Sequence, residues 1–190
     1  EDELRDQPGF AEAFLPQGHA PRVGDKFRFP DAARTLRLIA RSKGRDYYEG
    51  ELAERMVAFS AQCGAALTLD DLRSYRPEWV QPIAKDYRGY TLNEIPPNGQ
   101  GIAALIALGI LEQFDVAGLP VDSAQSQHLQ IEAMKLAFAD LYRYVADPRS
   151  MAVTPEQMLD DGYLAERARL IDPNRATHFA AGRPHAGGTI

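Results

Sequence analysis

The chain has 190 residues, of which 45% are apolar and 25% are charged, values typical of a soluble globular protein. Its formal net charge of −6 argues against binding nucleic acid through the phosphates, which requires clustered Lys and Arg. The longest apolar run, residues 101–111, is too short to span a bilayer. We therefore expect no nucleic-acid partner and no membrane segment in this chain.

Cys63 is the only cysteine, which excludes an internal disulfide and a cysteine-based zinc site. It follows the apolar residues of an expected helix, and we predict a buried or half-buried structural thiol.

The first 75 residues predict an arm and three helices. Residues 1–30 are rich in Pro, Gly and charge and predict an irregular arm with one short helix. Asp31 is a suitable N-cap for a helix that Gly44 would end. An apolar stripe of helical period predicts one helix over residues 47–64. Thr68, followed three residues later by an Asp, predicts a capping box and a short helix.

After residue 75 the apolar period changes from helical to alternating. The residues "WVQPIAKDYRGYTLNEIPP" combine β-branched and aromatic side chains around a central turn, which predicts a β-hairpin at about 78–95. A strand pair this small needs further strands, and we expect the chain to borrow them from elsewhere. Helices are expected over about 101–114, from Asp122 or Ser123 to Pro148, from Thr154–Pro155, and over 162–171.

Residues 172–190 have no periodicity and predict an extended loop that runs into a strand. The expected organisation is therefore an arm at 1–30, a helical domain with a hairpin at 31–171, and this loop. The chain starts without Met and stops on "HAGGTI", so we expect it to be a piece of a longer chain. It contains no signal peptide, which leaves the compartment open.

Five polar residues of the longest expected helix invite a functional interpretation. His128 and Glu132 lie four residues apart, but no third ligand follows at a suitable spacing, so an exposed or capped polar pair is favoured over a metal site. Asp140, Arg143 and Asp147 predict surface or helix-end ion pairs.

A family resemblance enters at residues 86–115, "DYRGYTLNEIPPNGQGIAALIALGILEQFD", which resemble the γ-glutamyltranspeptidase family. The blocks "YYEGELAERMV", "LTLDDLRSYRPEWVQPIAKDYRGY" and "HLQIEAMKLAFADLYRYVADP" match it in the same order, and the resemblance covers about Glu12 to Ile190. It implies an N-terminal-nucleophile hydrolase, made as one precursor that cuts itself into a large and a small subunit. It also implies an α+β, mostly helical fold within an αββα sandwich.

The resemblance also implies a processing site. The family cleaves itself just before a Thr, and Thr189, after Gly187 and Gly188, matches that position. Thr189 would then be the catalytic nucleophile, acting on γ-glutamyl amides such as glutathione. The partner would be the small subunit made from the same precursor, with no cofactor and no metal. The substrate-binding residues would lie outside this chain, which alone should be inactive.

The chemistry of these residue types agrees with that role. A Thr hydroxyl is a weak nucleophile unless a base lies beside it, and a freed α-amino group with a pKa near 7.7–8.0 can be that base. Gly187 and Gly188 allow a strained turn at the cleaved bond, where a Cβ would obstruct it.

Two departures leave alternatives open. The family's usual Pro-Pro followed by serines and glycines reads "PPNGQG" here, which looks more like an acylase-like branch, and Ile190 replaces a second Thr. Transfer, hydrolysis and an acylase acting on another amide are all consistent with the sequence. A non-catalytic helical scaffold that only shares ancestry is the alternative from another class.

Overall fold

A computed structural model describes residues 2–184 of the chain, so the predicted site residues Gly187, Gly188 and Thr189 lie outside the described residues. The chain divides into two compact units between Pro77 and Glu78. This boundary falls inside the expected 31–171 domain, and the three-part organisation stays a prediction.

The first unit is helical. Its capping box is confirmed: Thr68 Oγ1 accepts the Asp71 N–H at 3.2 Å, and the Thr68 N–H donates to Asp71 Oδ2 at 2.8 Å. The short helix expected in the arm is present. The helices are α1 (Phe10–Phe14), α2 (Pro30–Ser42), α3 (Arg45–Glu49), α4 (Glu51–Gln62) and α5 (Leu69–Ser74).

The single helix expected over residues 47–64 is wrong, because Gly50 divides it into α3 and α4. Asp46 folds its carboxylate over Gly50 and accepts the N–H groups of Glu51 and Leu52, each at 3.2 Å. A Cβ on Gly50 would lie 2.0 Å from Asp46 Oδ1. The break therefore comes from a carboxylate that caps the second helix.

Two further expectations for this unit are corrected. The N-cap of α2 is Phe29, and Asp31 lies in the first helical turn because Pro30 occupies the first helical position. Cys63 is exposed, not buried, since it is the C-cap residue of α4.

The second unit begins with the expected hairpin. Strands β1 (Ile83–Tyr87) and β2 (Tyr90–Glu94) are antiparallel, and Tyr87 pairs with Tyr90 across the turn. The turn residues Arg88 and Gly89 have φ values of 50° and 84°. Positive φ at both central residues matches the natural twist of paired strands, which explains a glycine here.

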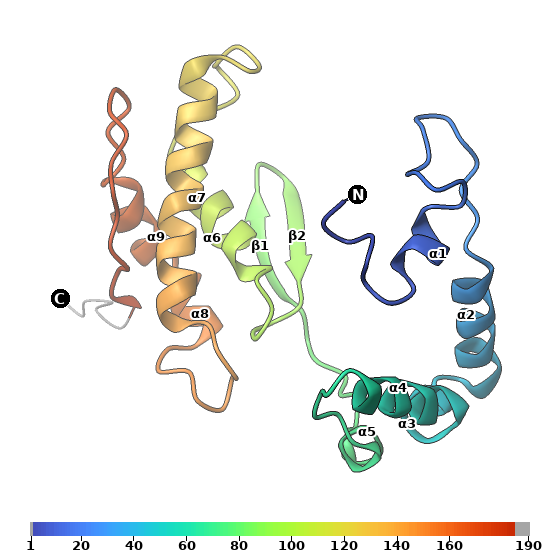
Figure 1. Cartoon of the computed structure of the whole chain (residues 1–190). Coiled ribbons are helices and arrows are strands. Elements are labelled where there is room, and N and C mark those ends of the chain that lie inside the picture. The colour runs from blue at the N-terminus through green and yellow to red at the C-terminus, as the bar shows by residue number, and fades with distance from the viewer. Residues whose placement is uncertain (1, 185–190) are drawn as a thin grey trace. The chain divides into compact units, whose positions relative to one another are not determined.

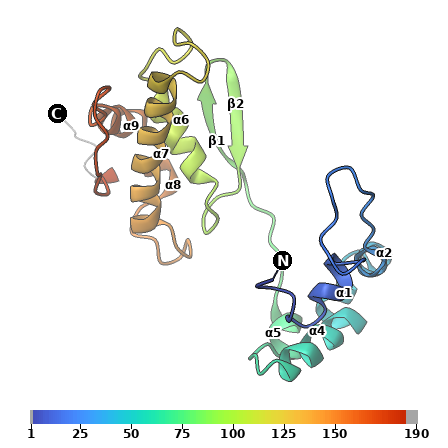
Figure 2. The same cartoon turned by 45° about the horizontal axis from the view of Figure 1, so that its top comes forward.

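Helix α6 (Ile102–Leu111) forms the centre of the second unit. It is apolar on all sides and packs against β1, α7 (Ala124–Tyr144) and α9 (Asp161–Ala168), as Figures 1 and 2 show from two directions. Ile102, Leu105, Ile106 and Ile110 are fully buried. Each such side chain stabilises the fold by about 1.5–3 kcal/mol relative to an exposed one.

The other helices of this unit begin at residues with capping side chains. Ser123 Oγ accepts the Ser126 N–H at 3.2 Å, which selects Ser123 over Asp122 as the start of α7. Thr154 forms a capping box for α8 (Pro155–Met158). The predicted α+β, mostly helical fold class is confirmed for the described residues. In that part of the chain no helix is both long and apolar enough to cross a membrane.

Candidate functional site

The part of the chain that leads toward the predicted processing site is described up to Pro184. After α9 it runs beside α7 in the same direction, as the red ribbon next to the orange helix in Figure 1 shows. We call residues 172–182 the leader segment. Its contacts identify the described residues that hold this part of the chain.

Helix α7 contacts the leader segment through one face. The contacting residues follow one another at intervals of four, and residues so spaced lie above one another on a helix. These residues are His128, Glu132, Leu136, Asp140 and Tyr144. Four of them contact the leader segment directly, whereas the carbonyl oxygen of Leu136 accepts from Arg167, which in turn holds Ala180.

Glu132 holds the middle of the leader segment. Its side chain is 1% exposed, and Oε2 accepts the Thr177 N–H at 3.0 Å while Lys135 Nζ donates to Oε1 at 2.5 Å. Burial acts to raise the pKa of Glu132, but the hydrogen bonds from Lys135 and Thr177 outweigh it and hold the pKa below its usual value. Lys135 also lies over the Phe179 ring, 5.3 Å from its centroid.

The prediction of an exposed or capped pair at His128 and Glu132 is therefore half wrong. The His128 ring nitrogen Nε2 lies 2.8 Å from the Asp172 carbonyl oxygen and donates to it, so this residue anchors the start of the leader segment. Glu132 is buried. Residues 2–184 contain no group of three or more His, Cys, Asp or Glu arranged to hold a metal.

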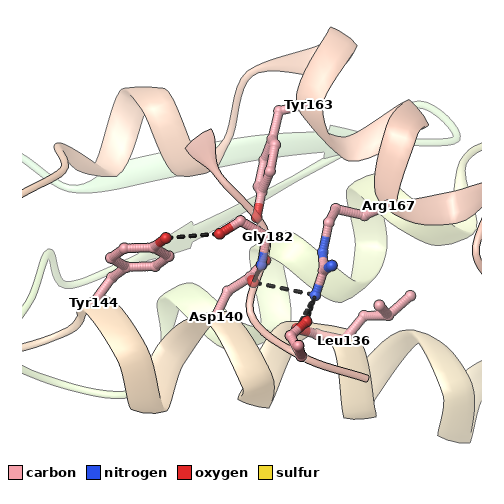
Figure 3. Close-up of polar contacts among 7 residues, drawn as sticks. Leu136, Asp140, Tyr144, Tyr163, Arg167 and Gly182 are labelled. Carbon is pink, nitrogen blue, oxygen red and sulfur yellow. Dashed lines mark hydrogen bonds and ion pairs between the residues drawn. The ribbon is translucent and has the colours of Figure 1, made fainter. Parts of the chain in front are cut away.

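Asp140 forms the centre of a second, fully buried contact with the leader segment (Figure 3). Its Oδ1 accepts the Gly182 N–H at 2.7 Å and pairs with Arg167 Nη2 at 3.1 Å. Its Oδ2 accepts the Tyr163 hydroxyl at 2.7 Å. Three donors thus surround one buried carboxylate, which is the condition under which a buried charge is tolerated.

Arg167 links this carboxylate to two backbone carbonyls. Its Nη2 donates to the Ala180 oxygen at 2.9 Å and to the Leu136 oxygen at 3.4 Å. Its Nε has no hydrogen-bond partner among the described residues. The guanidinium therefore bridges α9, α7 and the leader segment.

Gly182 is held through both of its backbone groups. Asp140 accepts its N–H, and the Tyr144 hydroxyl donates to its carbonyl oxygen at 2.6 Å. A Cβ on Gly182 would lie 2.1 Å from the Tyr163 hydroxyl oxygen and 2.9 Å from Arg167 Cδ. Only glycine fits here without displacing those side chains.

Asp140, Tyr144 and Arg167 bind backbone groups of the leader segment, and Tyr163 binds the Asp140 carboxylate. Burial, together with the hydrogen bond to the Asp140 carboxylate, raises the pKa of Tyr163 far above its ordinary value, so the phenol stays protonated and acts as a donor. We name the group formed by Asp140, Tyr144, Tyr163 and Arg167 the backbone clamp. Its chemistry is the recognition of an extended peptide.

The sequence-based interpretation of Asp140 was wrong, because Asp140 is fully buried and its partners come from α9 and the leader segment. Arg143 is exposed, and Asp147 pairs with Arg149, as expected of residues near a helix end. One feature of the sequence could have indicated the burial of Asp140. Tyr163 and Arg167 lie four residues apart on another helix and supply two donors for its carboxylate.

The model of the protein family described as Gamma-glutamyltranspeptidase matches residues 1–189 of this chain. The chain is 37% identical over 169 residues to the glutathione hydrolase-like YwrD proenzyme of Bacillus subtilis. This alignment covers 88% of the chain and 32% of that relative. It is 37% identical over 182 residues to the oxamate amidohydrolase proenzyme of Klebsiella pneumoniae, covering 96% of the chain and 34% of that relative. The chain thus spans about a third of the length of these curated relatives.

Among solved structures, the cephalosporin acylase from Bacillus halodurans superposes with a TM-score of 0.78 at 47% identity. The superposition covers 96% of this chain and 35% of the acylase chain. The likeness confirms the expected fold, that of N-terminal-nucleophile hydrolases. Together with the match over residues 1–189, it means that this chain belongs to the γ-glutamyltranspeptidase family.

Proposed function

We propose that this chain is part of a self-processing hydrolase or acyltransferase that cleaves amides through Thr189. The observation that carries the proposal is the match to the family model, which extends through Gly187, Gly188 and Thr189. The names of two curated relatives as proenzymes support processing of a precursor.

The first step is cleavage of the chain by itself. The Thr189 hydroxyl oxygen adds to the Gly188 carbonyl carbon, the C–N bond between the two residues breaks, and the hydroxyl proton ends on the freed α-amino group. Water then hydrolyses the resulting ester, which restores the hydroxyl and leaves Gly188 with a carboxylate. The products are two chains that stay together as subunits.

The second step uses the new N-terminus on a substrate. The neutral α-amino group of Thr189 accepts the hydroxyl proton as the oxygen attacks an amide carbonyl, and the leaving amine takes a proton. Water or an acceptor amine then removes the acyl group from the threonine. Neither step requires a cofactor. Because the small subunit would supply the rest of the site, the chain alone is expected to be inactive.

Two substrate classes are proposed. The family favours γ-glutamyl amides such as glutathione, with hydrolysis or transfer of the γ-glutamyl group. The similarity to an oxamate amidohydrolase and a cephalosporin acylase favours another amide, as does the sequence "PPNGQG". In both cases the reaction is acyl transfer from an amide to Thr189.

The proposal is tested by intact-mass measurement of the natural full-length precursor during incubation. We expect two fragments that divide between Gly188 and Thr189, and an uncut Thr189→Ala variant. Thr177→Ala is the matched control, because the structure uses the backbone N–H of Thr177 and this variant should be cut normally. A well-folded wild-type precursor that stays uncut would contradict the enzyme and favour the scaffold.

The processed protein then separates the substrate classes. Release of glutamate from glutathione, measured beside hydrolysis of oxamate and of a cephalosporin side-chain amide, gives three values of kcat/KM. A ratio above 100 in favour of glutathione supports the γ-glutamyl class, and the opposite ratio supports the acylase class.

A further inference from the structure

We infer that the backbone clamp positions the self-cleavage site by holding Gly182, and that Asp140, Tyr144, Tyr163 and Arg167 are positioning residues for processing. This inference rests on the proposed function, since it concerns cleavage between Gly188 and Thr189. Both of these residues lie outside the described residues. It would act on them through the intervening chain.

The first argument is that the clamp fixes an orientation as well as a position. The N–H of Gly182 donates to Asp140 at 2.7 Å, and its carbonyl oxygen accepts from Tyr144 at 2.6 Å. A residue held at both backbone groups cannot rotate freely about its chain axis. The direction in which residue 183 leaves is therefore set.

The second argument is that the clamp itself is rigid. Asp140 is fully buried, and the Arg167 side chain is 6% exposed. Tyr163 and Arg167 both bind the Asp140 carboxylate, so its oxygens are already oriented before Gly182 docks. Groups locked by buried partners hold a bound chain more precisely than groups in a surface loop.

The third argument concerns reach. Gly188 lies six residues after Gly182 and eight after Ala180, the preceding residue whose backbone is held, through its carbonyl oxygen, by Arg167. Six extended residues span about 20 Å, whereas eight span about 27 Å. Gly188 and Thr189 are neighbours in the chain, so releasing Gly182 does not separate the two reacting groups. It lowers instead the effective concentration of the cleaved bond at the folded groups around it, by about 1.5-fold on chain length alone. Loss of orientation lowers it further.

The experiment measures the rate of self-cleavage of the natural full-length precursor by quenched samples and intact mass. The test variant is Tyr144→Phe, which removes only the hydroxyl that holds the Gly182 carbonyl and keeps the half-buried ring. We expect cleavage about fivefold slower, the factor for one lost hydrogen bond. The matched control is Tyr142→Phe on the same helix. Tyr142 is 77% exposed, and the rate of this variant should equal that of the wild type.

A second control separates positioning from general stability. Ile110→Val shortens a fully buried side chain in α6 and lowers the melting temperature without changing any clamp contact. We expect it to cleave at the wild-type rate. The inference would be overturned if Ile110→Val slowed cleavage as much as Tyr144→Phe does. It would also be overturned if the cleavage rate of Tyr144→Phe lay within twofold of that of Tyr142→Phe.

The two proposals fail in different ways. If the folded wild type does not cleave between Gly188 and Thr189, the proposed function is wrong. If the wild type cleaves there and Tyr144→Phe cleaves at the same rate, the proposed function stands and the clamp has no part in positioning.

Discussion

Asp140 on α7 and Arg167 on α9 form an ion pair at 3.1 Å, with 0% and 6% of their side chains exposed. A pair buried this deeply contributes little net stability by itself, because both charges leave water. Replacing only one of the two residues lowers the stability of the fold, since the remaining charge stays buried without its partner. The pair therefore fixes the arrangement of α7, α9 and the leader segment.

The first prediction is that Arg167→Met destabilises the second unit by about 3–5 kcal/mol, because Asp140 is left buried without its counter-charge. The measurement is urea unfolding of the precursor carrying Thr189→Ala, so that a single uncut species is present. Arg143→Met is the control, an exposed arginine on the same helix, with an expected change below about 0.5 kcal/mol. A loss below 1 kcal/mol for Arg167→Met would contradict the importance of the pair.

The second prediction is that Gly182→Ala lowers stability by about 1–3 kcal/mol, because the new Cβ would lie 2.1 Å from the Tyr163 hydroxyl oxygen. In the double variant with Tyr163→Phe, which removes that oxygen, the total loss should be smaller than the sum of the two single losses. Gly99→Ala serves as the control, since a Cβ there meets nothing within 4 Å. If Gly182→Ala and Gly99→Ala have the same unfolding midpoint, the close contact at Gly182 is not real.

The third prediction concerns alkaline pH. The pKa of Tyr163 is raised in the folded state by burial and by Asp140, so its stabilising contribution is complete below the unfolded value of 10.0 and declines as the pH rises above it. Tyr163→Phe should be less stable by about 1.5–3 kcal/mol at pH 8, the value for a hydrogen bond to a charged group. The difference should shrink above pH 10. Urea midpoints from pH 8 to pH 11 measure it, and a constant difference would refute the assignment.

The fourth prediction concerns acid. The pKa of Glu132 is lowered in the folded state, so its contribution is present above the unfolded value of 4.5 and is lost as the pH falls through the folded value. Glu132→Gln should be less stable than the wild type at pH 7 by about 1–3 kcal/mol, and the two should converge below pH 4.5. Glu166→Gln, an exposed residue of α9, is the control and should follow the wild type. Parallel curves for Glu132→Gln would contradict the prediction.

Local signals in the sequence predicted many of the elements. The capping boxes at Thr68 and Thr154, the start of α7 at Ser123 and the hairpin turn at Arg88–Gly89 all depend on residues within a few positions of one another. Such short-range hydrogen bonding and turn chemistry are visible in a single sequence. The starts of these helices and the turn of the hairpin were therefore predictable, whereas the strands are shorter than the expected 78–95.

Long-range contacts were not predictable in this way. Asp140 looked like a surface residue because a carboxylate on a helix is almost never buried without partners. Its partners Tyr163, Arg167 and Gly182 lie 23, 27 and 42 residues further along the chain. Gly50 was misjudged for a related reason, since the helix break depends on the orientation that the Asp46 carboxylate adopts.

The spacing of the contacts on α7 also constrains the leader segment in length. Thr177, Ala180 and Gly182 are all recognised through backbone atoms, so side chains such as His178 can change without loss of a contact. The α7 residues that hold Thr177 and Gly182 are Glu132 and Asp140, which stand eight residues apart, about 12 Å along the helix axis. Removing one residue between Thr177 and Gly182 would withdraw about 3.3 Å of chain and put the two anchors out of register. Substitutions of exposed side chains in this stretch, such as His178, should be tolerated where deletions are not.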